Sequence, residues 1–307
     1  MSIAEPTVAK TPRVKRFAKE STNSEGNRKV SPLITVVMVI ICLAWLLPTF
    51  GLFVTSFRPL EAINSSGWWK AFANPLSATT WTFDNYSQVI SQGQTPMNIS
   101  FVNSLVVAVP ATIIPIMIAA FAAYAFTFME FPFRDTIFVI FVALLVVPNQ
   151  VALVPLLQLY GSLGLNGTFP AVWLAHAGFG MPLAVYILRN YMAGLPRAII
   201  ESAKIDGASH FTTFWRLIVP MSVPALASFA IFQFLWVWND LLIALIFLGQ
   251  GENMVLTVNV KGLLGQQGQG ANLLTAGAFI SMIVPILVFL ALQRFFVRGM
   301  TSGAVKG

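Results

Sequence analysis

Few side chains in this 307-residue sequence have the chemistry of a catalytic or metal site, and those few lie far apart. Neither His176 nor His210 has a second histidine at metal-ligand spacing. The single cysteine, Cys42, lies in an apolar run and excludes an intrachain disulfide. No Ser/His/Asp constellation and no pair of carboxylates occurs within the apolar runs. The sequence therefore predicts that this chain holds no metal and is not an enzyme.

A second group of polar side chains interrupts long apolar runs. These residues are Asn149, Gln150, Gln158, Gln233, Asn239 and Asp240. An unpaired carboxylate such as Asp240 deep in lipid would cost roughly 2.5–3.5 kcal/mol on insertion scales. We therefore expect Asp240 to face a cavity, a partner chain or the outer interface. The alternative is a packing or interfacial group near Trp236 and Trp238, since polar residues often join the helices of membrane bundles.

The composition shows what kind of element carries these side chains. The chain is 57% hydrophobic and only 9% charged, whereas an ordinary soluble domain is roughly a quarter charged. Runs of about 20 apolar residues are long enough to cross a bilayer. We predict an all-α polytopic membrane protein with six transmembrane helices, at approximately 33–55, 100–127, 136–160, 169–190, 217–249 and 273–297. Pro220 and Pro224 suggest that the fifth, which is long, begins in the interface and bends.

The basic residues predict the orientation of these helices. The formal net charge is +7, but the Lys and Arg residues form short clusters beside apolar runs, which argues against a nucleic-acid surface. With the N-terminus inside, fifteen of the 18 lie in inner segments and three in outer ones, Arg58, Lys70 and Lys261. Since basic loops stay in the cytoplasm, both termini are predicted to be cytoplasmic.

The same reasoning divides the chain into three parts. Residues 1–32 are polar and basic and are predicted to form a disordered cytoplasmic tail. The apolar run after them is too long for a secretory signal and lacks a small-residue cleavage site. Residues 33–300 form the six-helix transmembrane domain, and residues 301–307 form a C-terminal cytoplasmic tail.

The least apolar stretch between two predicted spans is the inner loop at residues 196–220. Pro196 suits the first turn of a helix over 197–206, Gly207 can end that helix in the left-handed conformation, and Ser209 can cap a second one. On the second helix an i, i+3, i+4, i+7 spacing predicts one apolar face made by Phe211, Phe214, Trp215 and Ile218. The loop could serve only as an interfacial anchor, or it could dock on another protein.

The residues of this loop resemble a known pattern. The stretch "ESAKIDGASHFTTFWRLIVP" (201–220) is similar to the EAA loop in the membrane subunits of bacterial ATP-binding-cassette (ABC) importers. In that loop Glu-Ala-Ala is followed by Gly after three residues and by an apolar-x-apolar-Pro ending after nine more. Ser202 replaces the first alanine, a small-for-small change. The residues on the pattern are Glu201, Ala203, Asp206, Gly207, Leu217, Val219 and Pro220.

The resemblance covers nearly the whole membrane region. It includes "FVNSLVVA" (101–108), "VPLLQLYGSLGLNGT" (154–168), "WNDLLIALIFL" (238–248) and "QRFFVRGMTSGAVKG" (293–307). These stretches look like the carbohydrate branch of the family, specifically the shorter, maltose-permease-like subunit of a heterodimeric pore. The resemblance implies the type I importer permease fold and a place in the bacterial cytoplasmic membrane, among its lipids.

The resemblance also implies the partners and the site residues. Sugar would arrive on an extracytoplasmic binding protein and cross a pore made with a second permease subunit. Two partner ATPase subunits would use ATP and Mg. No G-x-x-x-x-G-K-[ST] phosphate-binding stretch occurs in this chain, as expected if ATP binds to the partner subunits. The residues expected in the ATPase-coupling loop are Glu201, Ala203, Asp206, Gly207, Phe211, Phe214 and Pro220.

The same resemblance implies that some polar residues of the apolar runs line a pathway for the sugar. Those candidates are Asn149, Gln150, Gln233, Asn239 and Asp240, together with Gln158. An ion-coupled secondary transporter is the alternative from another class, but it would place ionisable residues near the bilayer midplane and show repeated halves. Only Asp240 meets the first condition, and no convincing repeat is present. The sequence does not identify the sugar.

Overall fold

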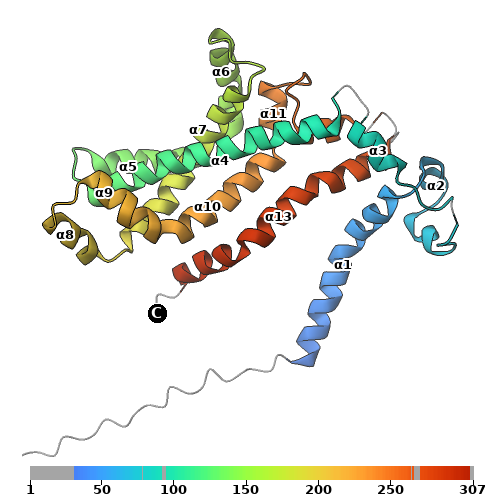
Figure 1. The fold of residues 1–307 in the computed structure, drawn as a ribbon, viewed down its shortest axis with the longest axis horizontal. Helices are drawn as coiled ribbons and strands as arrows, with labels where there is room; N and C mark the ends of the chain where they lie inside the picture. The colour runs from blue at the N-terminus through green and yellow to red at the C-terminus, as the bar shows by residue number, and fades with distance from the viewer. Residues whose placement is uncertain (1–30, 78, 92–94, 264, 266–269, 305–307) are drawn as a thin grey trace, which may run out of the picture. The chain divides into compact units, whose positions relative to one another are not determined.

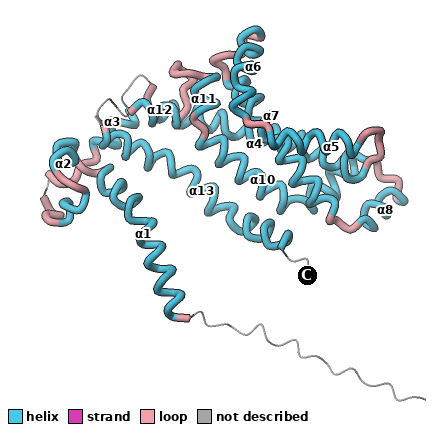
Figure 2. Tube along the Cα trace, turned by 180° about the vertical axis from the view of Figure 1, so that it is seen from behind, coloured by secondary structure: helices cyan, strands magenta, loops and turns pink. Residues whose placement is uncertain are grey.

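The computed structural model describes residues 31–77, 79–91, 95–263, 265 and 270–304, with side chains as far as Gln293. The predicted N-terminal tail therefore lies almost wholly outside the described residues. Every regular element in the described part is a helix, and no strand occurs there (Figure 2). The chain divides into two compact units, residues 1–48 and 49–307. The first contributes most of α1 (Pro32–Ser56), whose first 17 residues are all exposed. The whole of α1 is long and apolar enough for a membrane span.

Five single helices have the length and hydropathy of a membrane span, and a bent pair supplies a sixth. The single helices are α1, α4 (Met97–Phe128), α7 (Phe169–Ala193), the helix from His210 to Asn239, and α13 (Ala271–Ala304), whose counted span ends at Gln293. The all-α, six-span prediction is confirmed, although α13 continues without interruption through residues 301–304, which were predicted to be tail.

The third predicted span, 136–160, is broken. Helix α5 (Arg134–Ala143) continues through a short 3-10 turn (Leu144–Val146), and α6 (Asn149–Ser162) then leaves at an angle of 100°. The break falls at Pro148, which has no N–H to donate to a helical ladder. The preceding Val147 is extended, at φ −74° and ψ 121°, as the ring of a following proline favours. Figure 1 shows α6 projecting away from the direction of α5.

The fifth predicted span, 217–249, also differs from the prediction. The membrane helix begins at His210 rather than 217, and it ends at Asn239 rather than 249. It consists of α9 (His210–Thr213), a π-helical turn (Phe214–Ile218) and α10 (Val219–Asn239). The chain is extended at Asp240 before the short helix α11 (Leu242–Phe247). The π turn, which lies just before Pro220 and Pro224, is the irregularity observed in this helix.

Helices α4, α7, α10 and α13 form the body of the second unit. Helix α4 packs against both α7 and α10, and α13 packs along α10 (Figure 1). The side chains between α4 and α7 are small, because Ala108, Ala111 and Ala120 of α4 and Ala171 and Ala184 of α7 are all buried. Small side chains let two membrane helices approach closely, which explains the long contact between α4 and α7.

Two buried clusters fill opposite ends of this bundle. The first contains residues of α4, α6, α7, α10 and α11 and of α12 (Leu256–Gly262), including Trp238, Phe247 and Leu256. The second joins the other ends of α4, α7 and α10 to α8 (Arg197–Ile205), through residues such as Ile200 and Phe214. We call these ends the α12 end and the α8 end. Shorter elements at residues 60–91 are α2 (Leu60–Ser65), a 3-10 turn (Trp68–Phe72) and α3 (Asp84–Ser91).

Candidate functional site

The 196–220 loop contains the helix and the turn that the sequence predicts. Helix α8 ends at Ile205, and Gly207 follows in the left-handed conformation at φ 76°. The Gly207 N–H donates to the carbonyl oxygen of Lys204 at 3.1 Å, and the Ala208 N–H donates to that of Ala203 at 2.9 Å. This pair of bonds is a Schellman C-cap, in which glycine is favoured because a side chain is strained at that φ. The turn thus needs Gly207 for a local structural reason.

The charged side chains of this loop point away from the protein. Glu201, Lys204 and Asp206 are all exposed, and no salt bridge to any of them occurs among the described residues. The opposite face of α8 is anchored, because Ile200 and Ala203 are buried. Ile205 is 86% exposed beside the charged residues. The arrangement holds a mixed polar and apolar surface outside the body of the bundle.

The second part of the loop is the first part of the long helix from His210 to Asn239, and not a separate short helix. Ser209 caps it as predicted, since its side-chain oxygen accepts from the Thr212 N–H at 3.2 Å. Of the four residues predicted on one apolar side, Trp215 has its ring against those of Phe211 and Phe214, with centroids 6.2 and 5.2 Å apart. Phe214 and Ile218 are buried, but Phe211 is 68% exposed and Trp215 is 38% exposed. Pro220 is exposed in the first turn of α10, where it needs no N–H.

Helix α4 holds this part of the loop in place. The rings of Phe121 and Phe214 stack with their centroids 4.4 Å apart. Between Tyr124 Oη and His210 Nδ1 there is a hydrogen bond of 2.9 Å. Tyr124 is buried and His210 is exposed, so this bond ties the exposed start of the helix to the interior. Sequence reasoning did not find it, because the two residues are 86 positions apart.

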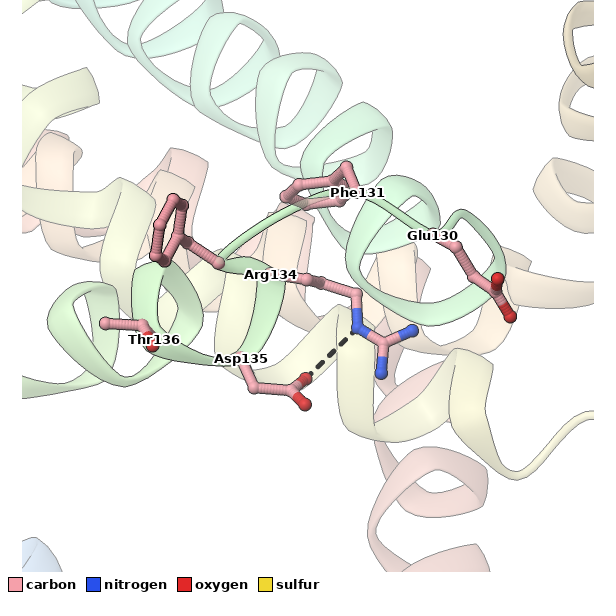
Figure 3. Close-up of a pocket in the computed structure, with 6 residues that line it drawn as sticks. Glu130, Phe131, Arg134, Asp135 and Thr136 are labelled. Atoms are coloured by element: carbon pink, nitrogen blue, oxygen red, sulfur yellow. Dashed lines mark hydrogen bonds and ion pairs between the residues drawn. The ribbon is translucent and has the colours of Figure 1, made fainter.

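A charged cleft of about 430 Å³ lies at the turn between α4 and α5 (Figure 3). Arg134 Nε donates to Asp135 Oδ1 at 3.1 Å, whereas Glu130 points away from this pair. Phe133 adopts a left-handed conformation at φ 60° and is 76% exposed, which is uncommon for a bulky residue. The cleft is open and superficial, and none of the predicted site residues lines it. We assign it no role in a pathway through the bundle.

The second candidate site is a cavity of about 210 Å³ between the α5–α6 break, α7 and α10. It brings together two of the predicted residues, Asn149 and Gln233. Asn149 opens α6 directly after the break at Pro148, and Gln233 lies on α10. The remaining lining residues are Leu144, Leu145, Phe179, Gly180, Pro182, Leu183 and Trp236. Because Phe179–Leu183 occupy the middle of α7, the cavity lies at the centre of the span.

The amide of Gln233 is fixed by the backbones of two neighbouring helices. Its Nε2 donates to the carbonyl oxygen of Ala111 on α4 at 3.1 Å and to that of His176 on α7 at 3.4 Å. Because both partners are carbonyl oxygens, which only accept hydrogen bonds, the amide nitrogen of Gln233 must face them. The side chain is only 3% exposed and lies directly over Gly180, where a Cβ atom would come within 2.5 Å of Gln233 Oε1.

The other predicted pathway residues lie outside this cavity. Gln150, Gln158 and Asn239 are exposed and do not line it. Asn239 Nδ2 donates to the carbonyl oxygen of Leu235, one turn earlier on its own helix, at 2.7 Å. The three amides are thus dispersed over the surface of the chain.

Asp240 has a local structural role. Its Oδ2 accepts from the N–H groups of Ile243 at 2.9 Å and Ala244 at 3.1 Å, which caps the start of α11. Its carbonyl oxygen accepts from Thr257 Oγ1 at 2.7 Å. His176 Nε2 lies 3.8 Å from Oδ2, across a cavity of about 10 Å³, which is the size of one water. Asp240 therefore faces a cavity, as predicted, but one too small for a sugar.

Comparison with known proteins gives the family of the chain. Residues 111–302 match the model of the family described as the binding-protein-dependent transport system inner membrane component. The chain belongs to this family. As a permease of this family with five long apolar helices and a bent pair, it is a multi-pass inner-membrane protein. The membership confirms the resemblance that the loop residues and the four other stretches indicated.

Two relatives are similar to this permease over most of its length. The osmoprotective compounds uptake permease protein GgtD of Synechocystis sp. is 53% identical over 298 residues, which are 95% of this chain and 99% of the relative. The alpha-glucoside transport system permease protein AglG of Rhizobium meliloti is 56% identical over 244 residues, 78% of this chain and 64% of the relative.

A solved structure is similar to this permease in fold. It is a chain of a bacterial ABC transporter involved in the import of the acidic polysaccharide alginate, with a TM-score of 0.61. The match covers 87% of this chain and 96% of that chain, at 15% sequence identity. This likeness confirms the importer-permease fold.

Sequence reasoning missed the aromatic and glycine residues of the mid-span cavity. Phe179 and Trp236 lie in apolar runs and give no signal apart from hydrophobicity. Gly180 has a helical backbone, so no turn pattern distinguishes it. Pro148 carried the one available signal, since a proline in the middle of a predicted span indicates a break. In this permease that break forms one wall of the cavity.

Proposed function

We propose that this permease is one of the two pore-forming subunits of an ABC importer for a carbohydrate. Its relatives are named for alpha-glucosides and osmoprotective compounds, and sequence motifs indicate the carbohydrate branch. The sugar arrives on an extracytoplasmic binding protein. A second homologous permease completes the pore, and two ATPase subunits hydrolyse ATP with Mg on the cytoplasmic side.

The basic residues orient the molecule in this proposal. The segments at the α8 end carry Arg134, Arg197, Lys204 and Arg216, so that end faces the cytoplasm together with both termini. The exposed surface of α8 then meets the ATPase. Glu201 and Asp206 make polar contacts with it, whereas Ala203, predicted to permit close approach of the ATPase, is buried and faces the bundle instead. Phe211 adds an exposed apolar contact on the neighbouring helix.

One observation carries the mechanism of coupling. A single helix runs from His210 in the exposed loop to Asn239 beyond the mid-span cavity. Thirty residues at about 1.5 Å each make it about 45 Å long. It carries Phe211 at one end and Gln233 and Trp236 near the other. Movement of an ATPase against the loop is therefore transmitted along one rigid element to the walls of the pathway.

Reconstitution tests this function. The permease is purified with its companion permease and ATPase subunits, placed in proteoliposomes, and supplied with its binding protein and a radiolabelled neutral disaccharide such as trehalose or maltose. We expect uptake that requires both ATP and the binding protein. Uptake by this chain alone along a proton or sodium gradient would instead identify an ion-coupled transporter.

A further inference from the structure

We infer that the charged cleft at the turn between α4 and α5 binds the headgroup of a phospholipid that carries a primary ammonium group, such as phosphatidylethanolamine. Arg134 binds the phosphate, and Glu130 and Asp135 accept hydrogen bonds from the ammonium group. The inference goes beyond the proposed function, because it assigns a lipid site outside any route through the bundle.

The cleft lies where two membrane-spanning segments end. Helix α4 ends at Phe128, and α5 begins at Arg134. The first is long and apolar enough to cross a bilayer by itself, and the second belongs to the bent pair that supplies a further span. The turn that joins them is therefore at the boundary between the hydrocarbon core and the headgroup region. A cleft of about 430 Å³ at this level is open to lipid headgroups (Figure 3).

Charges of both signs line the cleft. Arg134 Nε donates to Asp135 Oδ1, and Arg134 Nη1 donates to the carbonyl oxygen of Met129 at 3.4 Å, so the guanidinium is held in place. Its Nη2 makes no hydrogen bond with a described residue and can donate to a phosphate oxygen. The side chain of Asp135 is 76% exposed, and Glu130 is exposed without an ion pair among the described residues. A zwitterionic headgroup complements both signs, whereas a purely anionic one would also meet two carboxylates.

An apolar stripe leads from the cleft along α5. Phe133 lines the cleft, and it shares an i, i+4, i+7 spacing with Ile137 and Ile140. These three side chains are 76%, 37% and 56% exposed, and the spacing puts them on one side of the helix. An acyl chain can lie along this stripe while the headgroup occupies the cleft. Contact with lipid would also offset the unfavourable left-handed conformation that exposes the Phe133 ring.

A second guanidinium lies close to the same side of α5. Arg189 of α7 is placed over the ring of Phe138 at 4.5 Å from the centroid, and Phe138 follows Arg134 by one helical turn. Arg189 makes no salt bridge with any described residue, and its Nε is buried without a hydrogen-bond partner. Basic side chains between membrane helices near a bilayer surface attract lipid phosphates. Arg189 therefore favours a phosphate beside Arg134.

Lipid titration of the purified importer tests the site. The assembly of both permeases and the ATPase subunits is delipidated in detergent. Its thermal unfolding is then followed as phosphatidylethanolamine, phosphatidylcholine or phosphatidylglycerol is added. We expect phosphatidylethanolamine to half-saturate the stabilisation at a concentration at least about fivefold lower than the other two, because only its headgroup combines a phosphate with the N–H donors of a cation.

Variants localise the effect to the cleft. Glu130→Gln combined with Asp135→Asn should abolish the preference for phosphatidylethanolamine over phosphatidylcholine. Arg134→Gln should raise the half-saturating concentration of both lipids at least about fivefold, and Arg134→Lys, which keeps the charge, should stay within about threefold. Arg197→Gln is the matched control, since Arg197 is an exposed cation at the same end of the bundle, and it should leave the titrations unchanged.

The unfolding temperature before lipid is added shows whether each variant is folded. Glu130→Gln alone provides a variant that keeps the fold, because Glu130 is exposed and makes no ion pair with a described residue; it should weaken the preference for phosphatidylethanolamine. Equal titrations of the three lipids in the wild type, or an unchanged preference in the carboxylate variants, would overturn the headgroup site. Loss of a copurifying permease or ATPase subunit from these variants, with the lipid preference intact, would identify a protein contact and overturn it as well. None of these measurements depends on transport, so the proposed function is tested separately.

Discussion

The side-chain amide of Gln233 on α10 lies directly over Gly180 on α7, at a distance that leaves no room for a Cβ atom. From this position its nitrogen donates to the backbones of α4 and α7. One buried amide thus joins the three helices that pack most closely in the bundle. The contact depends on the absence of a side chain at Gly180.

Gly180→Ala should destabilise the permease by about 1–3 kcal/mol, because the new methyl group displaces Gln233 and leaves its buried polar atoms without partners. Thermal unfolding in detergent measures the effect. Gly178→Ala is the matched control on the same helix, since a Cβ atom there meets nothing within 4 Å. Equal stability of the two variants would contradict the close contact. In the Gln233→Ala background, Gly180→Ala should cost much less.

Gly207→Pro should leave the permease inserted but uncouple it from ATP hydrolysis. Proline cannot adopt φ 76° and lacks the N–H that donates to Lys204, so the Schellman turn cannot form. The measurement is sugar-stimulated ATPase activity of the reconstituted assembly, with membrane insertion checked separately. Gly207→Ala is the control, because it keeps the N–H and should lower the stability of the folded chain by only about 1 kcal/mol through backbone strain. Full coupling in Gly207→Pro would exclude the turn from the mechanism.

Glu201→Lys should weaken association with the ATPase subunits without lowering the stability of the permease. Glu201 is exposed and makes no salt bridge with any described residue, so the folded chain loses little when the charge is reversed. Copurification of the ATPase and the unfolding temperature are measured together. Glu252→Lys, an exposed carboxylate beyond the other end of α10, serves as the control. Normal transport by Glu201→Lys would argue against docking through this residue.

Asp240→Asn should transport nearly as well as the wild type, whereas Asp240→Ala should be less stable by about 1 kcal/mol. Asparagine keeps an oxygen that can accept from the Ile243 and Ala244 N–H groups, and alanine does not. Unfolding temperature and uptake at limiting sugar distinguish these variants. If the asparagine variant loses transport while it retains its stability, the charge of Asp240 has a role beyond capping.

Tyr124→Phe should loosen the start of the long helix by about 0.5–1.5 kcal/mol, since it removes the hydrogen bond to His210 but keeps the ring. Hydrogen exchange of residues 209–213 in the assembled importer measures the local effect. A double-mutant cycle with His210→Ala isolates the pair. Tyr186→Phe, on an exposed tyrosine of α7, is the control for loss of a hydroxyl. Unchanged exchange in Tyr124→Phe would show that ring packing alone holds this segment.

Much of this permease is determined by local rules that can be followed along the sequence. Hydrophobic runs of span length set the number of helices. Pro196, Gly207 and Ser209 define the ends of α8 and the beginning of the next helix, because caps depend on only a few neighbouring residues. The loop residues also identified the family, and Asn149 and Gln233 were found as polar residues in apolar runs.

Only the tertiary structure decided which of those polar residues meet. The break at Pro148 turns α6 by 100° and places Asn149 opposite Gln233, whereas Gln150, one position later, remains exposed. Packing against Phe121 of α4 buries Phe214, whereas Phe211, three residues earlier, stays exposed. Hydrophobic periodicity assumes an unbroken helix. Pro148 marks the break in the sequence, but which side chains the break brings together depends on packing between helices that are far apart in the chain.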